Sequence, residues 1–213
     1  FPTISASYPI ANYPFSGLTI YFDVTKGGWT FRNSIYNGAG YNGWRHNDNP
    51  FIIKPKKDGI FNMSQIEYQH KGGHYFAGAA LHTRHYPIDD EGEMAASNDA
   101  TNNTTCAWWI YGEQNLWTAG DKSIAAMLQY SENTSRSNGC YRFAEVGGAY
   151  KDSKNECGVS AQYAQFHQGI ERTLELTWKR QITESIALQP YFQYINNKNG
   201  DFTVLSARLY YSF

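Results

Sequence analysis

The stretch that most strongly predicts the fold is the C-terminal one, Ser185-Ile-Ala-Leu-Gln-Pro-Tyr-Phe-Gln-Tyr-Ile-Asn-Asn-Lys-Asn-Gly-Asp-Phe-Thr-Val-Leu-Ser-Ala-Arg-Leu-Tyr-Tyr-Ser-Phe213. It contains two runs in which apolar and polar residues alternate, and successive side chains of a β-strand point to opposite faces. The runs therefore predict a hairpin with one apolar and one polar face. Strands of about ten residues, aromatic residues near strand ends and a terminal phenylalanine favour a transmembrane β-barrel over a soluble sheet.

The composition agrees with a chain in which apolar residues alternate with polar ones instead of forming long apolar runs. The chain has 213 residues, 41% of them hydrophobic and 16% aromatic, and its length suits one domain. No run approaches the roughly 18 consecutive apolar residues of a transmembrane helix. The net charge of −1 gives no electrostatic reason to bind nucleic acid. The sequence starts at Phe1 without a methionine or a signal-peptide pattern, so we expect a mature chain or a fragment.

Eleven strands follow one another with almost no helical periodicity. Residues 1–16 contain three prolines, which predicts an extended loop rather than a central strand. The expected strands are 17–25, 28–37, 59–70, 73–84, 104–116, 121–131, 139–149, 155–166, 171–182, 185–195 and 202–213.

The connections between these strands alternate in length. Segments 38–58 and 85–103 are long, 132–138, 167–170 and 196–201 are intermediate, and the connections at the opposite strand ends are short. Outer-membrane barrels have short periplasmic turns and longer extracellular loops, usually with an even number of strands. We therefore expect Phe213 at the periplasmic rim. An odd count means either that a strand has been miscounted or that an N-terminal part of the barrel is missing from this sequence.

Several segments resemble the C-terminal part of the carbohydrate-selective (glucose) porins of bacterial outer membranes. They are Ile170–Trp178, Leu188–Ile195, Ala207–Leu209, Tyr111–Trp117, Ala144–Tyr150, Gly158–Ala164 and the opening Phe1-Pro2, Tyr8-Pro9 and Gly17-Leu18 pattern. The resemblance spans nearly the whole chain but only the latter part of the family's length. It implies a barrel of about sixteen strands and the diffusion of sugars.

The fold class expected is therefore all-β: a transmembrane antiparallel barrel in which residues 1–213 form a single outer-membrane domain. The expected function is passive diffusion of sugars or other small neutral polar solutes across the bacterial outer membrane. Small carbohydrates and outer-membrane lipid or lipopolysaccharide are the expected partners, with no nucleic acid, no cofactor and no metal. The oligomeric state, including a homo-oligomer, is left open.

The alternation also predicts which side chains line the pore. The candidates are Arg32, Glu67, His82, Arg84, Trp109, Glu113, Glu175, Gln189, Gln193 and Arg208. Charged and amide side chains can donate to and accept from sugar hydroxyls, and aromatic rings offer a flat apolar face to a pyranose. The alternative for any one of these residues is a wall-bracing contact that never meets solute. The run 139–149 is ambiguous, because Arg142 and Glu145 fall on opposite faces, and a bulge would explain this.

Other functions and sites remain as alternatives. They are a barrel-shaped structural or adaptor subunit with a plugged lumen, an outer-membrane enzyme, and a soluble β-sandwich or lectin. The sequence contains no Gly-x-Ser-x-Gly pattern that would support the enzyme. His70, His74, His82, His85 and Asp89–Glu91 lack the tight spacing of a metal site. Cys106 and Cys140 are expected at the same rim, where a disulfide needs loop bending and is left open.

Overall fold

The structure is a computed structural model that describes residues 18–38, 53, 55–56, 59–84, 104–134 and 139–212. The expected extended loop 1–16, the acidic run Asp89–Glu91 and Phe213 lie outside these residues. Among the described residues there is no helix long and apolar enough to span a membrane.

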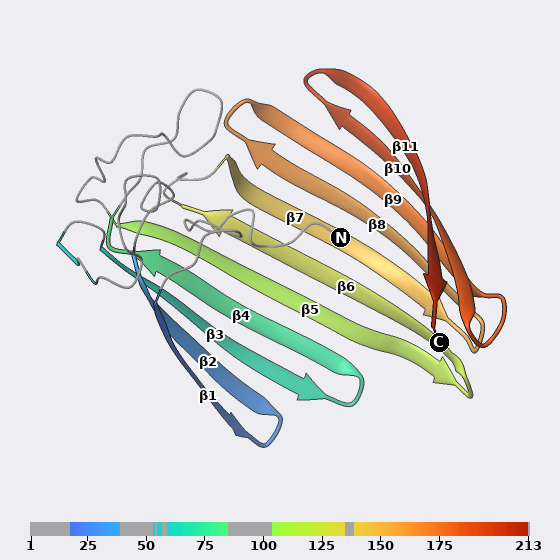
Figure 1. Cartoon of the computed structure of the whole chain (residues 1–213), viewed down its shortest axis with the longest axis horizontal. Helices are drawn as coiled ribbons and strands as arrows, with labels where there is room; N and C mark the ends of the chain where they lie inside the picture. Colours follow the sequence, from blue (N-terminus) through green and yellow to red (C-terminus); the bar gives the residue numbers. More distant parts are fainter. Residues whose placement is uncertain are drawn as a thin grey trace.

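The fold class expected from the sequence is confirmed, because the described residues form one sheet of eleven antiparallel strands in chain order (Figure 1). The strands are β1 (Thr19–Lys26), β2 (Trp29–Asn37), β3 (Ile60–His70), β4 (Gly73–His82), β5 (Thr105–Ala119), β6 (Lys122–Asn133), β7 (Cys140–Lys151), β8 (Asn155–Phe166), β9 (Gly169–Gln181), β10 (Ile186–Asn197) and β11 (Gly200–Tyr211). Each strand pairs only with its neighbours in sequence, so β1 and β11 are the edges of the sheet.

The two ends of the sheet differ in their connections. We call the end with the turns Gly27–Gly28, Lys71–Gly72 and Gly120–Asp121 the turn rim, and the opposite end, where β2 ends and β3 begins, the loop rim. The glycines of these turns have positive φ, from 59° to 85°, which favours glycine. The expected difference in length holds between β1 and β7. Further along, β8–β9 and β10–β11 are joined by two-residue turns even at the loop rim, because these strands extend further than the sequence predicted.

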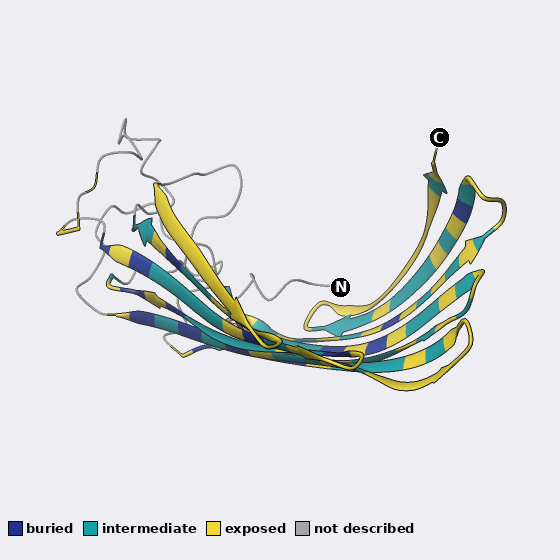
Figure 2. Ribbon diagram, turned by 90° about the horizontal axis from the view of Figure 1, so that it is seen from below, coloured by how far each residue is buried: buried dark blue, intermediate teal, exposed yellow. Residues whose placement is uncertain are grey.

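The two faces of the sheet have opposite chemistry. Figure 2 shows an open trough, and we call its concave side the inner face and its convex side the outer face. Large apolar side chains of the outer face are exposed, such as Leu205 at 77% and Leu176 at 44%, whereas the inner-face carboxylates Glu67, Glu145 and Glu175 are buried. This is the reverse of a soluble sheet, which packs its apolar face inward.

Aromatic residues of the outer face gather near both rims. At the turn rim they are Trp29, Tyr75, Trp117, Trp178 and Tyr211, all exposed. At the loop rim they are Trp108, Tyr130, Tyr163 and Tyr194. Aliphatic residues such as Ile110, Leu128, Val146 and Leu174 lie between them. An apolar band between two aromatic girdles is the lipid-facing pattern of a transmembrane barrel.

The ambiguous run around Arg142 is explained by an ion pair on the outer face. The register does shift between Cys140 and Arg142, so the expected bulge is present. Arg142 nevertheless stays on the face opposite Glu145, where its Nη2 lies 2.7 Å from Oε1 of Glu132. Its Nη1 donates to Gln165 Oε1 at 3.2 Å. Near the loop rim, β7 therefore has both a bulge and a charged residue on the outer face, Arg142, whose charge is neutralised by Glu132 of β6.

No disulfide joins any of the three cysteines Cys106, Cys140 and Cys157, all of which lie in described strands. The disulfide between Cys106 and Cys140 that the sequence left open is therefore absent from the structure. The two residues lie on β5 and β7, with β6 between them, and neighbouring strands are about 4.8 Å apart.

Candidate functional site

The inner face is the candidate site, because the antiparallel register aligns its polar side chains in rows across the strands. One row runs through Glu67, Phe76, Tyr111, Gln129, Glu145 and Gln162, from β3 to β8. A second contains Gln69, His74, Glu113, Met127, Gly147, Ser160, Glu175 and Gln193. Of the predicted residues, Glu67 falls in the first row and Glu113, Glu175 and Gln193 in the second.

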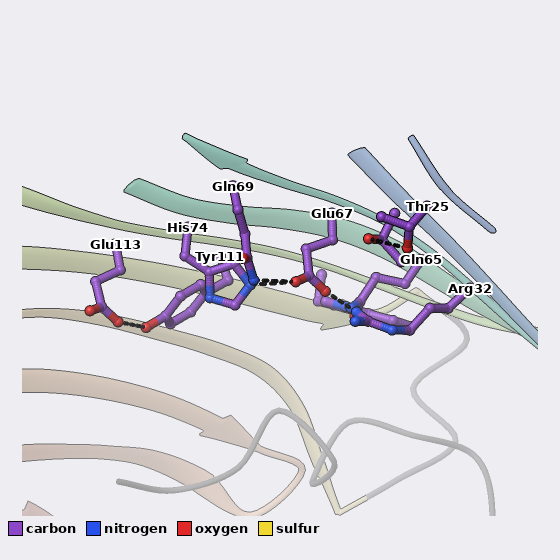
Figure 3. A network of polar contacts seen from close by, with 10 residues as sticks. Thr25, Arg32, Gln65, Glu67, Gln69, His74, Tyr111 and Glu113 are labelled. Carbon is purple, nitrogen blue, oxygen red and sulfur yellow. Dashed lines mark hydrogen bonds and ion pairs between the residues drawn. The ribbon is translucent and has the colours of Figure 1, made fainter. Parts of the chain in front are cut away.

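A carboxylate-centred network occupies the inner face of β2–β4 (Figure 3). Glu67 accepts a hydrogen bond from Nη1 of Arg32 through Oε2 and one from Nε2 of Gln69 through Oε1, at 2.8 Å. Nε2 of His74 lies 3.0 Å from Oε1 of the same carboxylate. The predicted pore-lining residues Arg32 and Glu67 are thus brought together, and Arg32 is neutralised by its partner.

A stacked aromatic pair lies beside this network. The rings of Phe76 and Tyr111 have centroids 4.6 Å apart and planes inclined by 13°. The Tyr111 hydroxyl donates to Oε2 of Glu113 at 2.6 Å, as Figure 3 shows. Glu113 is exposed, so its remaining acceptor capacity can face solute. Phe76 and Tyr111 were not among the predicted site residues, although their positions in the alternation would have placed both on the inner face.

Three of the predicted residues lie near the loop rim and are held by other contacts. Trp109 is only 1% exposed and donates from its indole nitrogen to Gln65 Oε1 at 3.1 Å. It belongs to a buried apolar cluster with Phe61, Ala80 and Ala107, so its ring is packed in the wall and is not available for stacking on a solute.

His82 is also buried. Its Nε2 lies 3.0 Å from the carbonyl oxygen of Gly38, and its Nδ1 accepts a hydrogen bond from the backbone N–H of Arg84 at 3.0 Å. The Arg84 guanidinium donates to the backbone carbonyl of Lys56. These two predicted residues therefore connect the end of β4 to neighbouring backbone at the loop rim.

A buried polar cluster that the prediction missed lies at the centre of the sheet. Glu145 on β7 accepts hydrogen bonds from Nε2 of Gln129 on β6 and from Nε2 of Gln162 on β8. Gln162 also donates to Oγ of Ser160 at 3.2 Å. All four residues are buried. The two amides satisfy the carboxylate in place of a cation, which lowers the cost of burying it.

Four predicted residues from three strands converge on one inner-face cavity of about 330 Å³. Its lining consists of the predicted Glu175, Gln189, Gln193 and Arg208, together with Thr177, Tyr191 and Ser206. Thr177, Tyr191 and Ser206 were not among the predicted residues, although the alternation along their strands places them on the same face. A volume of this size lies at the lower end of the range for small-molecule sites.

Hydrogen bonds fix the orientation of the groups around this cavity. Nε2 of Gln193 donates to Oε2 of Glu175 at 2.6 Å, and Nε2 of Gln189 donates to Thr177 Oγ1 at 2.7 Å. The Tyr210 hydroxyl donates to Gln189 Oε1 at 2.6 Å. Side chains held in this way lose little further conformational freedom when a ligand binds, which favours affinity.

The inner face of the described strands offers both hydrogen-bond donors and acceptors. In that part of the chain no group of histidine, cysteine, aspartate or glutamate side chains could hold a metal ion. His85 and Asp89–Glu91, which the sequence brought together with other histidines, lie outside it.

The fold is similar to that of solved porins. The chain matches OprB from Pseudomonas putida with a TM-score of 0.68 and 13% identity over 93% of this chain. It matches the anion-selective porin from Comamonas acidovorans with a TM-score of 0.56 and 11% identity over 90% of this chain. OmpT, an outer membrane protein of Vibrio cholerae, matches with a TM-score of 0.51 and 12% identity over 98% of this chain.

No protein-family model matches the sequence, and no curated protein matches it. The chain spans 59% of the length of OprB, 56% of that of the Comamonas porin and 73% of that of OmpT. At these low identities the likeness concerns the fold alone. The described sheet is therefore a porin-like β-barrel wall that is not closed on itself.

Proposed function

We propose that this protein is a porin of the bacterial outer membrane that allows sugars and other small polar solutes to diffuse passively through its lumen. The observation that carries the proposal is the polar inner-face cavity that Gln189 and Arg208 help to line. The opposite face of the same wall is apolar and exposed. A polar lumen within an apolar exterior is the arrangement of water-filled barrels.

The outer face supports the membrane location. Exposed apolar side chains cover it from β1 to β11, and contiguous apolar surface of this extent is rare on soluble monomers. The two aromatic girdles fit the headgroup regions on either side of a hydrocarbon layer. The turn rim would face the periplasm and the loop rim the outside.

The inner face supports sugar as the solute. Amide and hydroxyl groups from Thr177, Gln189, Tyr191 and Gln193 line the cavity, and each can exchange hydrogen bonds with a sugar hydroxyl. The carboxylates of Glu67, Glu145 and Glu175 each accept a hydrogen bond from a glutamine amide, so the wall itself compensates these charges. Such a wall favours polar solutes over apolar ones.

Planar-bilayer conductance tests the proposal. The protein purified from its native membrane fraction should form ion-conducting pores, and added glucose should reduce the current in a saturable way. Gln193→Ala should weaken the glucose effect, because it removes one amide from the cavity and leaves Glu175 without its donor. The absence of any conductance in correctly inserted protein contradicts the proposal.

We further infer that residues 1–213 belong to one barrel domain whose closure needs strands beyond the eleven described. The edges β1 and β11 do not pair with each other, and unpaired backbone groups are costly in hydrocarbon. The intact mass of the purified, conducting monomer measures this directly, and a mass of 24.2 kDa would exclude it.

A second candidate is a structural barrel with a plugged lumen. The observation that favours it is the buried apolar cluster of Phe61, Ala80, Ala107 and Trp109 on the inner face, because a wall that contacts only water and solute needs no such cluster. Conductance distinguishes the two, since a plugged barrel inserts without carrying current.

A further inference from the structure

We propose that the inner-face cavity at β9–β11 prefers a sugar that carries a carboxylate, such as a sugar acid, over a neutral sugar, and that Arg208 is the residue that binds the carboxylate. This inference rests on the proposed function and names the substrate class of the same site.

Arg208 differs from Arg32 and Arg142, because those two arginines form ion pairs with carboxylates of neighbouring strands. Arg32 is bound to Glu67 and Arg142 to Glu132. In the described strands no carboxylate lies within ion-pair distance of Arg208, whose Nη1 donates to the Tyr210 hydroxyl at 3.1 Å. Its remaining guanidinium N–H groups make no hydrogen bond to the described strands, and their planar fork matches the geometry of a carboxylate.

A second cation lies on the same side of the cavity. The ammonium group of Lys179 lies 4.6 Å above the centre of the Tyr210 ring, so the same tyrosine contacts both cations. Glu156 is opposite Lys179 in the β8–β9 register, but the two side chains form no ion pair in the described structure. Tyr210 thus contacts two positive charges that no carboxylate of the described strands pairs with.

The acidic group of the cavity lies at its other end. Arg208 is opposite Gln189, whereas Glu175 is opposite Gln193, four residues further along β10. At about 3.3 Å per residue, the two positions are about 13 Å apart along the strand. A bound carboxylate at Arg208 would therefore be far enough from Glu175 for repulsion to be largely screened at physiological salt.

The groups between these two ends suit the rest of a sugar. Thr177, Tyr191 and Ser206 lie between Arg208 and Glu175 in the cavity lining, and all carry hydrogen-bonding groups. A monosaccharide with its carboxylate on the Arg208 guanidinium would place its hydroxyls along this stretch. A neutral sugar could use the same hydroxyl contacts but would leave the two cations without a partner.

The test compares block of single-channel current by glucuronate and by glucose, with the protein from its native membrane fraction in planar bilayers. We expect glucuronate to bind about fivefold more tightly, the upper end for one solvent-exposed ion pair. Raising KCl from 0.1 to 1 M should remove the difference, because salt screens the charge interaction. Arg208→Gln should make the two sugars equal, and Arg208→Lys should restore part of the preference.

Arg180→Gln is the matched control, because it removes a positive charge from β9 on the outer face, where the guanidinium lies near the Trp178 ring. It should leave the preference for glucuronate intact. Equal block by the two sugars in the unchanged protein, with glucose block still saturable, overturns this inference and leaves the proposed function standing. Pores that neither sugar blocks overturn both. A preference that survives Arg208→Gln also overturns the assignment to Arg208.

Discussion

Replacing Leu176 by arginine tests whether the outer face lies in hydrocarbon. Leu176 is on β9, midway between the outward-facing Arg172 and Arg180, so about 13 Å of strand separates it from each. Its register neighbours are Val159 on β8 and Phe192 on β10, both apolar. The position is therefore near the middle of the apolar band, where a charged side chain cannot reach water easily.

The expected cost follows from this depth. An arginine that faces lipid at the bilayer midplane destabilises a barrel by about 2–4 kcal/mol. If water covered the outer face instead, the substitution would remove an exposed leucine and cost less than about 0.5 kcal/mol. The difference between these two values is larger than the usual uncertainty of an unfolding experiment.

Urea unfolding of the protein in lipid vesicles, followed by tryptophan fluorescence, measures the effect. With a denaturant dependence of about 1–3 kcal/mol per molar urea, Leu176→Arg should lower the midpoint by roughly 1 M or more. Thr177→Arg is the matched control, since the neighbouring residue lines the inner-face cavity, and it should shift the midpoint much less. Equal midpoints for the two variants would refute the assignment of the outer face to lipid.

Three further predictions concern the inner face and the turn rim. Gly78→Ala should destabilise the fold by about 1–3 kcal/mol, because a Cβ there would lie 2.3 Å from the Trp109 ring; an unchanged urea midpoint contradicts this. Glu67→Gln should also destabilise it by about 1–3 kcal/mol, since Arg32 loses its carboxylate, and adding Arg32→Gln should recover part of the loss in a double-mutant cycle. Backbone N–H donors hold the pKa of Asp152 at about 2, below its ordinary 3.8, so its stabilisation is complete above pH 3.8 and disappears as the pH falls towards 2. Asp152→Asn should therefore reduce the change of the urea midpoint between pH 3.8 and pH 2. If the midpoint of the variant changes with pH as much as that of the unchanged protein, this carboxylate contributes nothing.

The period of two in the sequence was sufficient to predict the sheet. Eleven strands were expected and the described residues form eleven, with ends mostly within a few residues of the predicted positions. Face assignment also followed from the sequence, because in a strand the side of a residue depends only on whether its position is odd or even. Arg32, Glu67, Glu113, Glu175 and Arg208 all lie on the face that alternation gave them.

Lateral contacts could not be predicted in the same way. Which residue lies beside Glu67 depends on the register of β2, β3 and β4, and a shift of one residue changes every neighbour. The register also contains a shift in β5 that the local pattern does not reveal, whereas the shift in β7 was expected from the ambiguous run 139–149. The pairing of Arg32 with Glu67, and of Arg142 with Glu132, therefore emerged only from the assembled sheet.

Accessibility was the other property that required the tertiary structure. Alternation places Trp109, His82 and Arg208 on one face, yet the first two are buried and Arg208 is exposed beside a cavity. Burial depends on what packs over a residue from other strands and segments, which the alternation of a single strand does not contain. The sequence by itself determined the two faces of this sheet, and the tertiary structure decided which residues of the inner face can meet a solute, because contact requires both the correct side and an open neighbourhood.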